Sequence, residues 1–83
     1  MTGLPSYVTP ADIAEAHEPP TKDLRRKMTR EIRKRLRRAG ILEADGPHRF
    51  HVAMSRLRER LPEYYERVLG FAAMRLNDAQ EDR

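Results

Sequence analysis

The sequence contains no cysteine and no tryptophan, and only 6% of its residues are aromatic. The absence of cysteine excludes a disulfide framework and a thiolate metal site. The three histidines, His17, His48 and His51, do not follow a spacing typical of metal ligands. No metal or other cofactor is therefore expected.

Long apolar runs are also missing, and the first residues, MTGLPSYVTP, have neither the basic nor the apolar region of a signal peptide. We therefore expect a cytoplasmic protein with no membrane span. Serine occurs only at Ser6 and Ser55, neither in a nucleophile motif, and no glycine-rich phosphate loop is present. The sequence predicts a protein that is not an enzyme.

Positive charge is abundant but confined to one segment. The 83 residues form a single small domain that buries only about 60% of the surface of its unfolded chain. Residues 22–38 hold ten Lys or Arg against Asp23 and Glu31, a net charge of +8, whereas residues 1–21 carry −3 and residues 39–83 carry −1. Such a concentrated basic segment is typical of a surface that binds a polyanion.

The basic segment is predicted to be a helix over 22–38. At about 100° per residue, four apolar residues fall on one face and four arginines on the opposite face; these are Leu24, Met28, Ile32 and Leu36, against Arg26, Arg30, Arg33 and Arg37. Thr21 is a good N-cap. Gly40 suits the left-handed C′ position, and Ile41 then completes a Schellman ending on Leu36.

A shorter helix is predicted before it, in VTPADIAEAHEPP. Thr9 caps this helix, Pro10 takes its first position and Asp12 can close a capping box, while Val8 can staple onto Ile13. A short helix, a tight turn and a capped basic helix form a helix-turn-helix arrangement.

Two short strands are expected next, at Ile41-Leu42 and Phe50-His51-Val52, joined by the turn signal Asp45-Gly46-Pro47. A hairpin directly after the basic helix is a wing. Residues 9–52 thus resemble the winged helix-turn-helix superfamily of DNA-binding proteins. The helix-turn-helix opening of small MerR-like and excisionase-like proteins is similar to TPADIAEAH followed by TKDLRR, and their wing is similar to GPHRF. The end of the recognition helix and the wing of ArsR- and MarR-like repressors resemble LRRAGIL followed by HRFHV.

The resemblance implies that the N-terminal half of helix 22–38 enters the major groove. Base edges would then be contacted by Thr21, Lys22, Arg25 and Arg26, since Arg suits bidentate contact with guanine. Phosphates would be contacted by Arg30, Arg33 and Arg37 of the helix and by His48 and Arg49 of the wing. The competing interpretation of the arginines is a solvated helix face, but two acids cannot neutralise ten cations.

The C-terminal third is predicted to be helical over 53–76, as one kinked helix or two nearly coaxial helices joined at Pro62, with a single apolar seam from Met54 to Leu76. After Pro62 the apolar surface widens. Tyr64, Leu69, Phe71 and Met74 are therefore expected either to contact a second copy in a symmetric dimer or to pack within the monomer on the segment GLPSYV.

The expected fold is mainly α with a short β-hairpin, a winged helix-turn-helix plus a kinked C-terminal helix. It is preceded by an N-terminal arm over 1–8 and followed by a frayed tail over 77–83. The leading functional expectation is sequence-specific binding of double-stranded DNA by a small, phage- or plasmid-type transcriptional regulator or excisionase-like factor associated with the nucleoid. The alternatives are RNA binding and a protein-interaction module, such as a phage-encoded inhibitor, whose basic helix docks an acidic partner.

Overall fold

The first helix, α1 (Pro10–Ala16), begins as its capping residues predict. The Thr9 hydroxyl accepts a hydrogen bond from the Asp12 amide, and the Asp12 carboxylate accepts one from the Thr9 amide, each over 3.0 Å. The capping box is therefore confirmed. The computed structural model describes residues 5–81, with side chains described through Met74.

The basic helix, α2 (Lys22–Arg38), has the predicted bounds. Thr21 caps it by accepting a hydrogen bond from the Leu24 amide over 3.1 Å. At its other end Gly40 has a φ of +74°, and the amides of Gly40 and Ile41 donate to the carbonyls of Arg37 and Leu36. These two bonds define a Schellman motif, so the predicted ending is confirmed.

A three-stranded antiparallel sheet lies beside the two helices, in the order β1-β3-β2. Its strands are β1 (Tyr7–Val8), β2 (Glu43–Ala44) and β3 (Phe50–Ala53). The hairpin β2–β3 was predicted, but its first strand was expected two residues earlier. Ile41 cannot start a strand because its amide is bound to the Leu36 carbonyl in the helix ending. Strand β1, inside the expected N-terminal arm, was not predicted; it pairs Tyr7 with Ala53 and Val8 with Val52.

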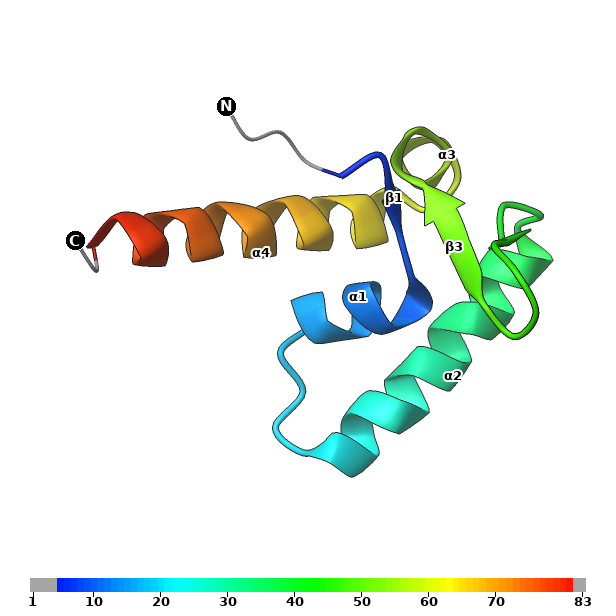
Figure 1. Ribbon diagram of the computed structural model, residues 1–83, viewed down its shortest axis with the longest axis horizontal. Helices are drawn as coiled ribbons and strands as arrows, with labels where there is room; N and C mark the ends of the chain where they lie inside the picture. The colour runs from blue at the N-terminus through cyan, green and yellow to red at the C-terminus, as the bar shows by residue number, and fades with distance from the viewer. Residues whose placement is uncertain (1–4, 82–83) are drawn as a thin grey trace.

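The core forms where α1, α2, β3 and the C-terminal helices meet. Four side chains are completely buried there, one from each of these parts: Ile13, Leu36, Val52 and Leu57. Ala14 of α1 is also fully buried, consistent with close contact between α1 and α2. Figure 1 shows α1 between α2 and the last helix, so α1 is the element on which both long helices rest.

The C-terminal helices, α3 (Met54–Arg60) and α4 (Pro62–Glu81), run in different directions, so the prediction of one kinked helix or two nearly coaxial helices was wrong. In Figure 1 α3 is seen end-on while α4 runs across the view. Leu61 has non-helical dihedrals, φ −136° and ψ 68°, and Pro62, which lacks an amide hydrogen, starts a new helix.

Helix α4 continues through Glu81, into the segment that was expected to fray, while residues 82–83 lie outside the described part. The predicted apolar seam ended at Leu76, and the side chain of Leu76 also lies outside the described part of the structure. Of the helices in the described part of the chain, none has both the length and the apolar character needed to cross a bilayer.

Candidate nucleic-acid interface

The outer face of α2 carries a row of arginines, which we call the arginine ridge: Arg26, Arg30, Arg33 and Arg37. All four are exposed, whereas Ile32 and Leu36 on the opposite face are buried. The predicted amphipathic arrangement is thus present in the structure. The ridge runs from the second turn of the helix to its last turn.

The N-terminal part of α2 extends beyond the core. Leu24 was expected on the buried stripe, but it is 42% exposed, and Met28 is only half-buried. The reason is the length of α1, which ends at Ala16 and leaves nothing for the first turn of α2 to rest on (Figure 1). Thr21, Lys22 and Arg26, predicted to contact bases, are exposed on this projecting part.

Two of the ten cations of α2 hold the fold together. The Arg25 guanidinium lies 3.2 Å from the Glu15 carboxylate, linking α2 to α1, although Arg25 had been assigned to base contact. Arg35 lies 3.2 Å from Glu63 of α4. Among the described side chains, the other eight cations of α2 form no ion pair, so most of its charge is available to a partner.

Arg35 has a second contact on α4. It donates a hydrogen bond over 3.3 Å to the hydroxyl of Tyr64, and its guanidinium lies 5.2 Å from the centre of that ring. This hydrogen bond raises the pKa of Arg35 above its ordinary value, and the nearby Glu63 carboxylate acts in the same direction. Arg35 therefore contacts α4 and is not part of the ridge.

The hairpin brings further cations to the side of α2. Asp45 and Arg49 close its turn, where the Asp45 amide donates to the Arg49 carbonyl over 2.8 Å. Gly46 and His48 both have positive φ, 108° and 70°. His48 and Arg49 are exposed at the tip of the turn, as their predicted role in phosphate contact requires.

A groove of about 420 Å³ separates the hairpin from α2 and the start of α1. Thr29 and Arg33 line it from α2, and His48 and Arg49 line it from the hairpin. A second groove, of about 370 Å³, shares Thr29 and Arg33 and continues along α2; its other lining residues are Ala11, Arg25, Arg26 and Arg30. We call the two together the basic groove.

The basic groove brings together most of the predicted contacts, and two features of it were missed. The predicted contacts that share it are Arg25, Arg26, Arg30, Arg33, His48 and Arg49, whereas Thr21, Lys22 and Arg37 lie outside its lining. Sequence reasoning did not identify Thr29 or the start of α1 as its floor, because a turn signal does not show which helix face a hairpin approaches. Asp45, an acid on the wall of the groove, was assigned only to the turn.

The predicted partner surface on α4 is only partly exposed. Tyr64 is 7% exposed and lies edge-on to His17 at 5.8 Å, so its assignment to this surface was wrong. It is buried because the turn at Leu61 points α4 back over α1. Leu69 and Phe71 are half-buried, and Met74 is 44% exposed.

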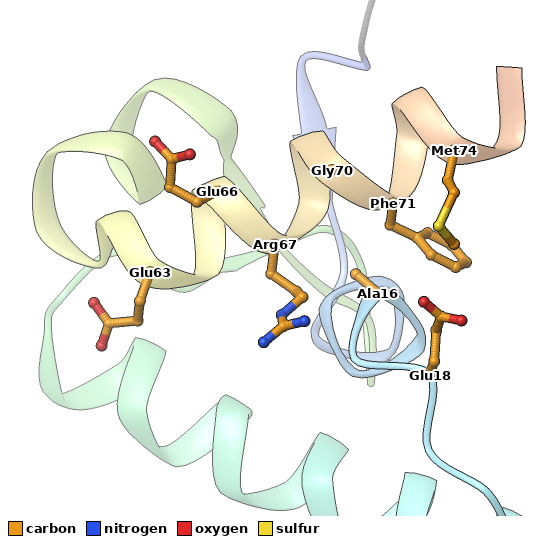
Figure 2. A pocket seen from close by; sticks show the side chains of 8 residues that line it. All are labelled: Ala16, Glu18, Glu63, Glu66, Arg67, Gly70, Phe71 and Met74. Carbon is orange, nitrogen blue, oxygen red and sulfur yellow. The ribbon is translucent and has the colours of Figure 1, made fainter. Parts of the chain in front are cut away.

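Phe71 and Met74 line an open groove of about 490 Å³ between α4 and the end of α1. Figure 2 shows Gly70 and Phe71 above Ala16, with Glu18 at the opening beside Met74. Glu18 follows the end of α1 and adopts a left-handed conformation, φ 52°. His17, the C-cap of α1, donates from its Nδ1 to the Ile13 carbonyl over 2.8 Å, as expected of a helix-end residue.

Among the described residues, no group of three or more His, Cys, Asp or Glu side chains is placed to hold a metal ion. The chain matches no family model, no curated protein and no solved structure.

Proposed function

We propose that this protein binds double-stranded DNA as a small winged helix-turn-helix protein, with α2 in the major groove and the β2–β3 hairpin on the backbone. The observation that carries the proposal is the basic groove. Cations from two separate elements, Arg33 of α2 and Arg49 of the hairpin, line the same groove, with one acid, Asp45, on its described walls. A solvated helix face would not require the hairpin to contribute.

The shape of α2 supports insertion into a groove. A helix about 10–12 Å across fits the major groove of B-DNA, which is about 12 Å wide. Within the described residues, no helix or strand lies beyond the first turn of α2 in Figure 1, and Leu24 in that turn is 42% exposed. Arg26, Lys22 and Thr21 would face base edges there. Arg25 would have to release Glu15 before it could do so.

The remaining cations suit phosphates. Arg30 and Arg33 line the basic groove, and guanidinium groups bind phosphodiester oxygens. The Thr29 hydroxyl in the same lining donates to the Arg25 carbonyl over 2.7 Å. His48 and Arg49 would contact the backbone from the other wall. Arg37 would extend this row of phosphate contacts along the ridge.

Duplex DNA is favoured over single strands because the basic groove offers little aromatic surface. Phe50 is the aromatic residue in its described lining, and it is half-buried. Binding of single-stranded nucleic acid relies on several exposed aromatic rings for stacking. The proposed biological role is that of a transcriptional regulator or excisionase-like factor. On a palindromic site two copies would bind, with Leu69, Phe71 and Met74 as the proposed contact between them.

The test is fluorescence anisotropy with random-sequence duplex DNA, duplex RNA and single-stranded DNA, each over a salt series. Tightest binding to duplex DNA, with a log–log salt slope of about −0.9 per phosphate contacted, would support the proposal. Equal or tighter binding to RNA would contradict it. If no nucleic acid binds, the basic groove would instead be assigned to binding an acidic protein partner.

A further inference from the structure

His51 lies at the centre of the sheet and contacts three other segments of it. Its ring stacks on Tyr7 of β1, with 4.3 Å between ring centroids and 24° between planes. Its Nε2 lies 3.9 Å from a Glu43 oxygen on β2, and its Nδ1 lies 3.6 Å from an Asp45 oxygen in the turn. Val52 is buried, so His51, its neighbour on the strand, is turned away from the core helices. Tyr7, Glu43 and Asp45 are the titratable groups that face it.

Each ring nitrogen lies near a carboxylate but beyond hydrogen-bond distance, and a protonated ring suits this arrangement better than a neutral one. A neutral imidazole has one N–H and one nitrogen lone pair, so in either tautomer one of the two carboxylates faces a lone pair. A protonated imidazolium has an N–H on each nitrogen and can donate to both carboxylates. Protonation therefore draws Asp45 and Glu43 toward His51 and offsets their charge.

Asp45 connects this contact to the basic groove. It lines the same groove as Arg33, His48 and Arg49, where a phosphate would approach. Its carboxylate is 62% exposed and therefore repels that phosphate through solvent, weakly but at short range. An imidazolium at His51 would remove most of this repulsion and hold the turn that carries His48 and Arg49.

We propose that His51 is a positioning residue that makes DNA binding by the basic groove pH-dependent, with protonation of His51 neutralising Asp45 and raising the affinity for the phosphate backbone. The inference rests on the proposed function. Because one exposed charge is offset, the affinity should be about threefold to tenfold higher at about pH 5.5 than at about pH 8, on either side of the usual titration range of histidine.

The experiment measures duplex DNA affinity at both pH values and constant ionic strength, in a His48→Gln background. This background is needed because His48 lines the groove and would add its own charge at low pH. In that background, His51→Phe keeps a ring to stack on Tyr7 but cannot be protonated. The affinity ratio between the two pH values should fall to about one, with Asp45→Asn giving the same flat profile and tighter binding at pH 8.

His17→Gln is the matched control, since His17 lies on α1 and donates to the Ile13 carbonyl. It should leave the affinity ratio unchanged. The melting temperature of each variant is measured at both pH values, so that unfolding is not mistaken for lost affinity. If the His51→Phe variant keeps the same ratio of DNA affinities between the two pH values as its His48→Gln parent, the inference is overturned.

A second measurement uses the protein without DNA. In an NMR titration, the ring signals of His51 and the backbone amide of Asp45 should change with the same midpoint. Independent midpoints would also overturn the inference. If duplex DNA binds but His51→Phe keeps the affinity ratio between the two pH values, this inference fails and the proposed function stands. If no duplex DNA binds at either pH, the proposed function itself fails.

Discussion

Arg35 of α2 and Tyr64 of α4 are joined by a hydrogen bond of 3.3 Å, and the guanidinium also lies 5.2 Å from the centre of the tyrosine ring. This contact fixes α4 relative to the basic helix on the side away from the arginine ridge. It separates the cations of α2 by role, since Arg35 and Arg25 hold neighbouring helices while the ridge remains unpaired within the described residues.

Tyr64→Phe should weaken the fold without affecting nucleic-acid binding. The substitution keeps the buried ring but removes the hydroxyl that accepts from Arg35, so a small loss of unfolding free energy is expected. Urea unfolding followed by circular dichroism measures the loss. Unchanged stability together with weaker DNA binding would show that this hydroxyl faces the ligand instead.

Arg26→Ala tests the assignment of base contacts. Arg26 is exposed on the projecting part of α2, so its loss should cost about 1–3 kcal/mol on the specific site and much less on random duplex. Measuring it needs an operator obtained by selection from a random duplex library. Equal losses on both duplexes would make Arg26 a phosphate contact.

Thr21→Ala should destabilise the protein by about 1 kcal/mol, because the Thr21 hydroxyl caps α2 through the Leu24 amide. Thr21→Ser retains a capping hydroxyl and should keep nearly all the stability. Thermal unfolding of the two variants compares them directly. If both lose stability equally, the methyl group rather than the hydroxyl contributes at this position.

Glu18→Gly should stabilise the protein by roughly 0.5–1 kcal/mol. Glu18 has a φ of 52°, which strains a residue with a side chain, and the relief exceeds the entropy that glycine loses on folding. Glu18→Gln serves as the control, since it removes the charge but keeps the strain. A gain of the same size from glutamine would attribute the effect to charge.

The first two helices, α1 and α2, could be predicted closely because their ends depend on local chemistry. Thr9 with Asp12, and Gly40 with Ile41, make hydrogen bonds only to residues a few positions away, so the sequence specifies them directly. The amphipathic pattern likewise predicted the burial of Ile32 and Leu36 opposite the exposed arginine ridge, but not the 42% exposure of Leu24. The finer assignment to winged helix-turn-helix remains a proposal.

Features that depend on distant contacts could not be predicted in the same way. Strand β1 has two residues and exists because β3 offers it an edge. Tyr64 was placed on a partner surface since a helical wheel cannot show that α4 turns at Leu61 and buries it. The position of the hairpin against α2 was needed to predict that Arg33 and Arg49 line one groove. The same holds for the contact of His51 with Asp45.

The most direct test of the account compares two double substitutions that remove the same charge. Arg30→Gln with Arg33→Gln removes two cations of the basic groove, whereas Arg56→Gln with Arg60→Gln removes two exposed cations from α3, which lies away from the outer face of α2 (Figure 1). Affinity for random duplex DNA is measured over a salt series for both. The account predicts that the first pair weakens binding by about tenfold or more and shallows the log–log salt slope by about two units, while the second pair changes little. Equal losses from both pairs would mean that net charge, and not the basic groove, binds DNA.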